Sequence, residues 1–452
     1  DLAGTAALNK TTSGTVSLSG ANSYSGATTL SAGTLVTDAG SLGGTSGITV
    51  NGATLTAVDA KSTATLSLNG TGFATFSAAG LSLGSVTNAN ATVGALQFTA
   101  STGTVTIGSL GGGGHTSFAS DAATTSGISG GTVVVTGLLT SAISGGTVSA
   151  GTLSSASITG GATTIASDAT VTMLNLGTLT VGGTTTITTL TAGTANLNGA
   201  TASVTTLNGG AVALGSTALT VSAGTSAGVI SGANGSLIKA GAGALTLTGA
   251  NTYGGTTTIN AGTLTSSAGS LAGTSGLTVN GGALVAVNYN AAATLDVTSS
   301  GTATISGTGL TLSGAVTNAN TTANSLNFSG LTGTITLTSL TGAGSTRFGS
   351  AATITSGVSA GTVTVVGLLT TDLSGGTVSA GSLSSASVTG GTTSVTGAAG
   401  VTIFNGGTLT VGGVATIGTL TSGTANLNGT TSSVATLNGG TIVLGTTALT
   451  VS

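Results

Sequence analysis

The sequence predicts an all-β protein that folds as a parallel β-helix, or β-solenoid, made of two tandem repeat units. Three observations lead to this fold class. Short runs alternate between apolar and polar residues, the same motifs return at short and long intervals, and residues that favour helices are scarce. The 452 residues include 82 Gly, no Pro and only 2% charged residues, none of them Glu.

The alternating runs have the period of two that a β-strand requires. Typical runs are Thr-Val-Thr-Ile at 104–107, Thr-Leu-Thr-Val at 178–181 and Leu-Thr-Leu-Thr at 245–248. Side chains of successive strand residues point to opposite faces, so such runs bury one set and expose the other. The runs end at Gly, Gly-Gly or Asn-Gly, for example Asn51-Gly52 and Asn280-Gly281, which tolerate the positive φ angles of turns.

Asn-Gly between alternating runs is also typical of a β-hairpin, so an antiparallel sheet is the alternative fold. Successive turns, however, carry the same motif in the same orientation. Stacking of like motifs favours parallel coils about 4.8 Å apart over hairpins.

Two long units can be aligned with each other. The segment 144–151 returns at 374–381 and the segment 194–199 returns at 424–429, both at the same offset in the numbering. Earlier matches, such as 20–22 with 249–251, have an offset shorter by one, which places one inserted residue near Ser313. We therefore expect a first unit at 1–222, incomplete at its start, and a second unit at 223–452. We interpret the chain as a mature or excised part of a longer tandem array.

A finer period lies inside each unit. Similar Ser/Thr-Gly-Gly motifs at 129–133, 144–148 and 159–163 are equally spaced. Elsewhere the spacing is looser, on the order of 15 to 20 positions, and such a short repeat cannot bury its own apolar face. It must stack on its neighbours, as in a solenoid.

Composition excludes several classes. The β-branched content and positive mean hydropathy are unlike a disordered chain. Gly, Thr and Ser interrupt every apolar stretch, so we expect no membrane-spanning helix. A net charge of −3 without a basic cluster is unlike a nucleic-acid-binding protein. The absence of Cys excludes disulfides, so backbone ladders and packing must stabilise the fold.

Residues that could do acid–base chemistry are few, and most have no equivalent in the other unit. His115 aligns with Ser345, and Asp121 aligns with Ala351. The remaining mismatches are Asp168 with Ala398, Asp372 with Ala142, Asp59 with Asn288 and Arg347 with Ser117. Only Lys10 and Lys239 correspond. An active site would therefore be absent from the twin unit, and we expect a non-enzymatic protein with no catalytic, cofactor-binding or metal-binding residues.

Some local patterns permit a second interpretation. His115 and Asp121, beside the glycines at 111–114, could form a small acid–base or metal site, although a solvated loop is the simpler interpretation. Matched aromatic pairs could stack on sugars, although core filling is the simpler interpretation here too: Tyr24 and Tyr253, Phe98 and Phe328, Phe118 and Phe348.

Two further patterns concern the surface. N-glycosylation sequons begin at Asn9, Asn90, Asn234, Asn320 and Asn428, but such matches arise by chance in an Asn/Thr-rich chain. The threonine arrays at 184–189 and 256–258 could form a flat ice-binding face, whereas Thr also simply favours strands.

One segment of each unit carries a denser motif. Residues 239–264 combine Lys239, Gly-Ala-Asn-Thr-Tyr at 249–253, three threonines and Ala-Gly-Thr-Leu at 261–264, and a weaker copy lies at 10–35. This motif resembles the autotransporter-associated β-strand repeat of bacterial autotransporter passengers. The resemblance covers only these two segments, a small part of each unit. It implies a right-handed parallel β-helix, export across the outer membrane and a location at the cell surface.

Together these patterns predict an extracellular structural fibre or stalk, serving as surface filament, matrix or adhesin scaffold. The expected partners are further copies of the chain, end to end or side by side, and cell surfaces or glycans. The alternatives are an adhesin that binds a specific glycan or receptor, a polysaccharide-active β-helix enzyme and an ice-binding solenoid.

Overall fold

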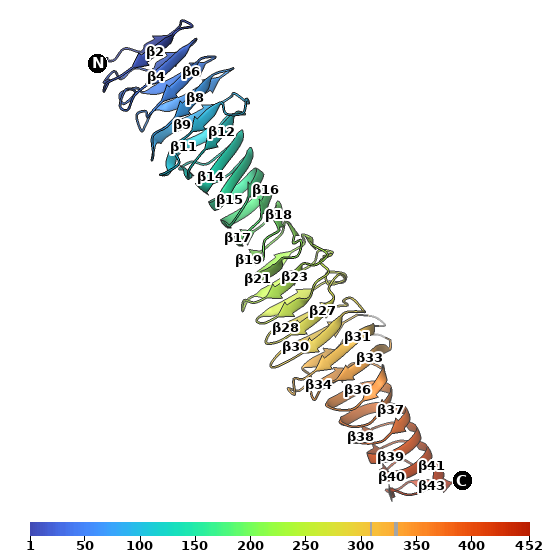
Figure 1. Cartoon of the computed structure of the whole chain (residues 1–452). Helices are drawn as coiled ribbons and strands as arrows, with labels where there is room; N and C mark the ends of the chain where they lie inside the picture. Colours follow the sequence, from blue (N-terminus) through green and yellow to red (C-terminus); the bar gives the residue numbers. More distant parts are fainter. Residues whose placement is uncertain (308–309, 330–332) are drawn as a thin grey trace. The chain divides into compact units, whose positions relative to one another are not determined.

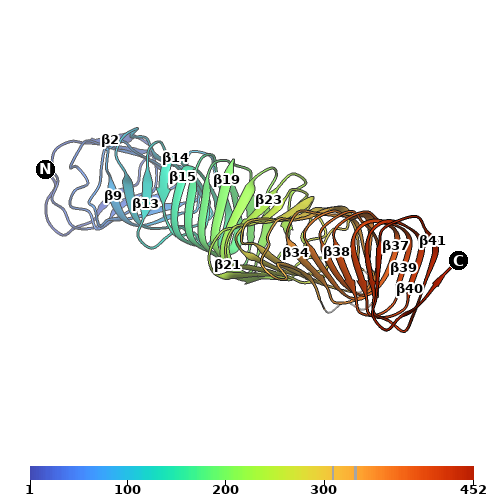
Figure 2. The ribbon, with the colours of Figure 1, turned by 90° about the horizontal axis from the view of Figure 1, so that it is seen from below.

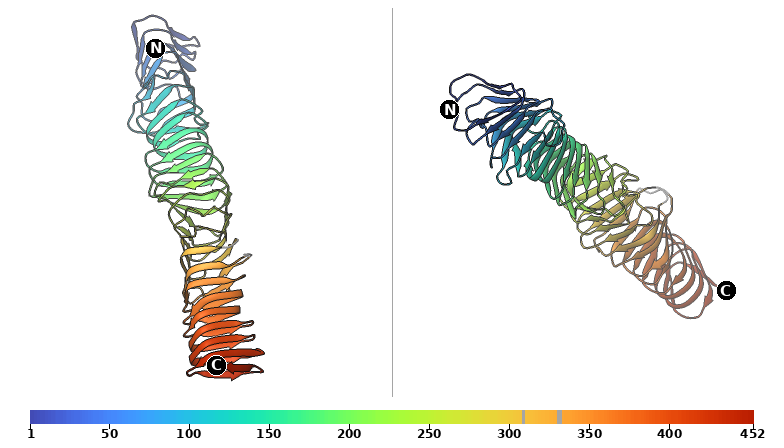
Figure 3. Two further views of the ribbon diagram at one scale, coloured as in Figure 1. Left: turned by 90° about the vertical axis from the view of Figure 1, so that its right-hand side faces the viewer. Right: turned by 45° about the horizontal axis from the view of Figure 1, so that its top comes forward.

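The computed structural model describes residues 1–307, 310–329 and 333–452, and all regular structure in these residues is β-strand. The chain divides into two compact units, Asp1–Thr217 and Ala218–Ser452. Within each unit, strands of successive coils lie side by side (Figure 1). Figure 2 and Figure 3 show the same stacking from other sides. No helix in the described residues is long and apolar enough to cross a bilayer.

The first unit contains β1 (Leu8–Lys10), β2 (Thr15–Leu18), β3 (Thr28–Leu30), β4 (Thr34–Thr37), β5 (Gly47–Asn51), β6 (Thr54–Ala57), β7 (Thr65–Asn69), β8 (Phe73–Phe76), β9 (Ser82–Asn88), β10 (Leu96–Phe98), β11 (Val105–Gly111), β12 (His115–Phe118), β13 (Ala122–Thr124), β14 (Thr132–Thr140), β15 (Thr147–Ile165), β16 (Ala169–Val181), β17 (Thr185–Leu190), β18 (Thr194–Leu197), β19 (Thr201–Leu207) and β20 (Ala211–Ala213).

The second unit contains β21 (Ala218–Ser226), β22 (Ile230–Ser231), β23 (Ser236–Lys239), β24 (Ala244–Leu247), β25 (Thr257–Ile259), β26 (Thr263–Ser266), β27 (Gly276–Val279), β28 (Ala283–Val287), β29 (Thr294–Val297), β30 (Thr302–Ser306), β31 (Thr311–Asn318), β32 (Leu326–Phe328), β33 (Ile335–Thr341), β34 (Ser345–Phe348), β35 (Ala352–Val358), β36 (Thr362–Leu373), β37 (Thr377–Val388), β38 (Thr392–Val395), β39 (Ala399–Val411), β40 (Ala415–Leu427), β41 (Thr431–Leu437), β42 (Thr441–Leu444) and β43 (Ala448–Val451).

Strands of neighbouring coils pair in parallel, which confirms the predicted solenoid and excludes the hairpin alternative for these strands. Val133 of β14 lies opposite Val148 of β15, so this coil has the spacing of the Ser-Gly-Gly motifs. Thr106 of β11 pairs with Ser82 of β9, so the coil between them is longer than the sequence spacing predicts. The hand of the coil stays a prediction.

The residue inserted into the second unit forms a β-bulge. Leu337 of β33 pairs with Leu312 of β31, and Ser339 pairs with Ala315. Between these two pairs β31 contains one residue more than β33, so the register shifts around the Ser313 that the sequence comparison identified. A bulge absorbs one extra residue without disturbing the register of later strands.

Inward-facing residues of successive strands stack in columns that form the core. One column of the first unit runs through Leu30, Val50 and Leu68, all with no exposed surface. A second column holds three phenylalanines, Phe76, Phe98 and Phe118, on β8, β10 and β12. Outward positions of the same strands are mostly Thr and Ser, so the observed alternation matches the sequence pattern.

Turns between coils rely on glycines that stack on one another. Gly146 has φ +80°, and a Cβ there would lie 2.5 Å from the carbonyl oxygen of Gly131 in the preceding coil. Gly131 itself has φ +77°. Only glycine combines this backbone conformation with so close an approach of two chains.

We predict that Leu409→Ala destabilises the chain by about 2–5 kcal/mol, because Leu409 on β39 is fully buried and its loss leaves a cavity. Urea unfolding measures the change. The exposed Thr402 of the same strand is the control, and Thr402→Ala should change stability by less than about 0.5 kcal/mol. Equal effects of the two substitutions would contradict the assigned register.

We also predict that Gly146→Ala lowers the unfolding temperature clearly, because the new methyl group would overlap the Gly131 carbonyl at an unfavourable φ. Gly113→Ala is the matched control in the same unit, since its Cβ would meet no atom within 4 Å. Calorimetry of both variants tests this contrast. An unfolding temperature of Gly146→Ala equal to that of the parent chain would contradict the close contact between Gly146 and the Gly131 carbonyl.

Candidate functional site

A lysine in each unit is buried at an inward position of the core. Lys239 has no exposed surface and lies opposite Ile259 of the next coil. Its ammonium donates hydrogen bonds to the carbonyl oxygens of Gly241 and, at 3.0 Å, Ala261. Burial lowers the pKa of Lys239. Backbone carbonyls of two coils, rather than a carboxylate, thus surround this charge.

The glycine of the Ala-Gly-Thr-Leu motif makes room for the lysine. A Cβ on Gly262 would lie 2.7 Å from the Lys239 ammonium and would collide with the Gly241 carbonyl. The φ of Gly262, +65°, also favours glycine. In the first unit Lys10, 6% exposed, bonds to Thr12 and, at 3.1 Å, to Ala32, and Gly33 takes the place of Gly262.

A buried asparagine in the same segment joins three successive coils. The side-chain oxygen of Asn251 accepts a bond of 2.8 Å from the Ile230 backbone N–H. Its amide nitrogen donates at 2.9 Å to the Ser270 carbonyl. Asn22 makes the equivalent bonds to Leu2 and Ser41 in the first unit, at 2.7 and 3.1 Å.

A tyrosine and two threonines form a buried hydroxyl chain beside this asparagine. The Tyr253 hydroxyl lies 2.6 Å from the Thr257 hydroxyl, which lies 3.1 Å from the Thr274 hydroxyl of the next coil. Burial raises the pKa of Tyr253 to about 12, partly offset by its bond to Thr257. Tyr24, Thr28 and Thr45 repeat the chain in the first unit. We call Lys239, Asn251, Tyr253, Thr257 and Gly262, with their counterparts, the repeat clamp.

The histidine and the aspartates that the sequence analysis considered as possible site residues each accept a hydrogen bond from a different backbone N–H group. The Nδ1 atom of His115 accepts a bond of 3.3 Å from the Gly94 N–H, whereas Asp121 accepts one of 2.8 Å from the Leu138 N–H. These bonds tie the histidine to a preceding coil and the aspartate to a following one. Asp168 and Asp372 likewise cap backbone N–H groups of the following coil, at Thr184 and Ser387. No cluster of metal-ligating side chains occurs in the described residues.

The matched aromatic residues lie in the core. Phe98 stacks on Phe118 with ring centroids 4.7 Å apart, and Phe328 stacks on Phe348 at 5.0 Å. These rings are at most 2% exposed, and the tyrosines of the two clamps are at most 3% exposed. They fill the interior and present no platform for sugars.

Two of the five sequons are also interior. Asn90 and Asn320 are 3% and 4% exposed, and each donates a side-chain bond to a carbonyl of the preceding coil, Gly72 or Gly301. These asparagines cannot accept a glycan in the folded chain. Asn9, Asn234 and Asn428 are exposed.

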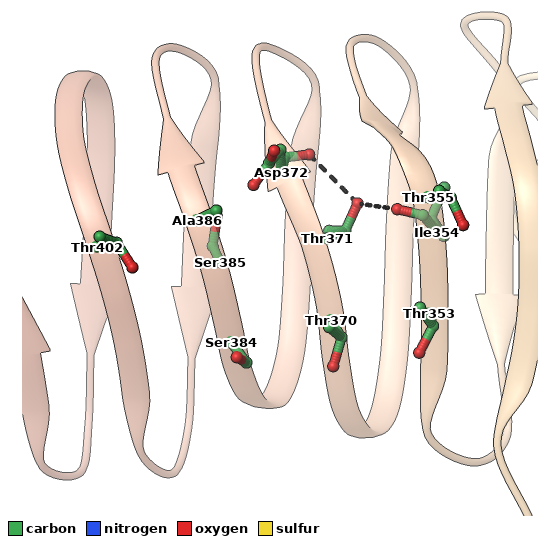
Figure 4. A pocket seen from close by; sticks show the side chains of 10 residues that line it. All are labelled: Thr353, Ile354, Thr355, Thr370, Thr371, Asp372, Ser384, Ser385, Ala386 and Thr402. Carbon is green, nitrogen blue, oxygen red and sulfur yellow. Dashed lines mark hydrogen bonds between the residues drawn. The ribbon is translucent and has the colours of Figure 1, made fainter.

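A hydroxyl-lined groove lies on the outside of the second unit, and sequence reasoning missed it. Figure 4 shows Thr353, Thr370 and Ser384 on successive strands along the groove, with Thr402 further on. Its volume is about 420 Å³. The first unit carries a groove of about 380 Å³ lined by the equivalent residues, including Thr140, the counterpart of Thr370. The recurrence of Ser and Thr at equivalent positions of the two units was the feature of the sequence that could have indicated this groove.

We predict that Tyr253→Phe removes part of the alkaline instability of the chain. Unfolded tyrosine ionises near pH 10.0, whereas folded Tyr253 ionises near 12, so its contribution to stability is complete below pH 10 and falls as the pH rises toward 12. Urea unfolding at pH 7 and 11 measures it. At pH 7 the free energy of unfolding of the variant should be about 1 kcal/mol lower, because the hydrogen bond to Thr257 is lost. Between pH 7 and 11 its free energy of unfolding should decrease less than that of the parent chain. Phe404→Leu, a buried substitution without an ionisable group, should keep the parental pH slope.

Comparison with known protein families matches the two clamp segments. Residues 8–36 and 237–265 each fit the family model described as passenger-associated-transport-repeat. No curated protein and no solved structure matched the chain significantly.

The matched segments begin in β1 and β23 and end in β4 and β26, so they contain the lysine, asparagine, tyrosine and glycine of each clamp. The matched segments therefore include the lysine and asparagine that join neighbouring coils. One match to the passenger-associated-transport-repeat lies in each of the two β-solenoid units, which is consistent with an autotransporter passenger repeat protein.

Proposed function

We propose that the chain is a stiff spacer within an autotransporter passenger, serving as a surface stalk or filament scaffold. The observation that carries this proposal is the internal use of polar groups: the lysine, asparagine and tyrosine of each clamp all bond within the stack of coils. Such bonds stiffen a stack of coils, and they leave these groups unavailable for chemistry. The repeat family suggests a secreted or surface location.

As part of this proposal, the chain has no enzymatic activity. Asp121, Asp168 and Asp372 each hold a backbone N–H of a following coil, which is a structural task. His115 accepts a backbone bond as well. General acid–base catalysis requires such groups to face a substrate, whereas the hydrogen bonds of these side chains to backbone N–H groups support a scaffold.

Association with further copies is part of the same proposal. Only 2% of the residues are charged, so little electrostatic repulsion opposes the approach of a second solenoid. Side-by-side packing of uncharged β faces would suit a filament or matrix protein, with cell surfaces as the other partner.

Distance measurements between two labels test the stiffness of one unit. The chain has no Cys, so Thr362→Cys and Thr441→Cys allow specific spin labelling at exposed positions. These residues are the ends of one column, Thr362, Thr377, Thr392, Thr408, Thr424 and Thr441. Five coil steps of about 4.8 Å predict a separation of roughly 24 Å.

A narrow distance distribution near that value, unchanged on cooling from room temperature, is the expected result for a spacer. The pair Thr362→Cys and Thr377→Cys, one coil apart, provides the matched short-distance control. A broad distribution for the long pair together with a narrow one for the short pair would show that the coils flex, and the spacer proposal would fail.

A further inference from the structure

The two grooves share their position in the repeat and their chemistry. The groove of the second unit crosses β35, β36, β37 and β39, and a continuation reaches Thr416 of β40. That of the first unit crosses β13 to β16. Lining residues at equivalent repeat positions include Thr125 with Thr355, Ser154 with Ser384 and Thr172 with Thr402. A hollow that recurs in both units is a feature of the repeat rather than an accident of one loop.

The groove follows an outward column that carries a hydroxyl residue on every strand except β39, where Gly400 takes that place. Thr353 pairs with Thr370, Thr370 with Ser384 and Ser384 with Gly400. Thr416 of the next strand follows Gly400. In the first unit the same column begins at Ala123, which has no hydroxyl, and continues through Thr140, Ser154, Thr170 and Thr186.

Hydroxyls beneath the groove are already bonded, whereas those of Thr370 and Ser384 in the column are available. Buried Thr371 donates to the Ile354 carbonyl at 2.9 Å, and buried Ser385 donates to the Ser387 carbonyl at 2.9 Å. The outward hydroxyls of Thr370 and Ser384 make no protein hydrogen bond within the described part of the chain. Each column thus offers a hydroxyl donor and acceptor in every coil except one, at Gly400 in the second unit and at Ala123 in the first.

Charge and shape restrict the ligand. No basic residue lines either groove, which disfavours phosphate and nucleic acid. The single charged residue is Asp372, whose counterpart is Ala142, and its Oδ1 atom already accepts the Ser387 N–H. The walls contain no aromatic residue and only one large apolar residue, Ile354, which disfavours an apolar peptide anchor.

We propose that each groove binds an extended, uncharged polysaccharide chain lying along the stacking direction of the coils. Sugar hydroxyls both donate and accept, as the Ser and Thr column does. A pyranose chain in an extended form advances by about one coil spacing, roughly 5 Å, per sugar, so successive sugars meet successive hydroxyls. The proposal goes beyond the spacer function and predicts two equivalent sites per chain.

The test compares two arginine double variants of the full chain. Ser154→Arg with Ser384→Arg places long side chains in both grooves. Ser149→Arg with Ser379→Arg makes the same change on the same strands, β15 and β37, at exposed positions outside the grooves. All four serines are exposed, so both variants should fold, which circular dichroism and melting curves check.

Titration calorimetry with cellohexaose and chitohexaose as neutral probes measures binding, and an alginate hexasaccharide serves as the acidic comparison. We expect two equivalent sites for at least one neutral probe, at least tenfold weaker binding by the groove variant and unchanged binding by the control variant. Absence of binding to both neutral probes at millimolar concentration would overturn the proposal. Equal losses in both variants, or equal binding of the acidic probe, would also overturn it. None of these outcomes bears on the spacer function, which the label distances test separately.

Discussion

The parallel, in-register contact between neighbouring coils is the constraint from which the rest of this structure follows. Coils stacked this closely leave no space for a Cβ where their turns meet, so glycines such as Gly131 and Gly146 lie on one another at positive φ. The same register stacks Leu, Val and Phe side chains of successive coils on one another in the core. A polar group turned inward is stabilised by a partner within the stack, as Lys239 and Asn251 are, whereas the buried Tyr289 hydroxyl has none among the described residues.

The repeat clamp bears on the register in which neighbouring coils pair. Short coils with nearly identical Ser-Gly-Gly-Thr-Val motifs could pair one coil too early or too late at little energetic cost. Lys239, Asn251 and Thr257 oppose such a slip, because each makes a buried hydrogen bond to the next coil that a shifted partner would disturb. The clamp of each unit therefore favours the observed register at its own place in the stack. This role gives a physical reason for the passenger-associated-transport-repeat to stand out from its surroundings.

Inside and outside of the solenoid divide the polar groups between two purposes. Inward Asn, Lys and Tyr side chains of the clamps are occupied by bonds within the stack, and four of the sparse aspartates cap backbone N–H groups, Asp59, Asp121, Asp168 and Asp372. The outward hydroxyls of Thr370 and Ser384 make no such bond within the described residues. Structural stiffness and surface recognition can therefore evolve on the same strands, since alternation separates the residues that serve each.

The amino-acid sequence alone determined the strand pattern, the long tandem repeat, the inserted residue near Ser313 and the likeness of 239–264 to a passenger repeat, because all of these depend on local order along the chain. Only the tertiary structure decided which distant residues meet. Coil lengths vary, from the short step that joins Val133 to Val148 to the long one that joins Leu312 to Leu337, so the partner of any side chain depends on every turn that precedes it. For this reason the backbone carbonyls that bind Lys239 and the column that includes Ser384 could not be predicted from the spacing of motifs in the sequence. The length and path of each coil determine which residues of the next coil lie beside these side chains.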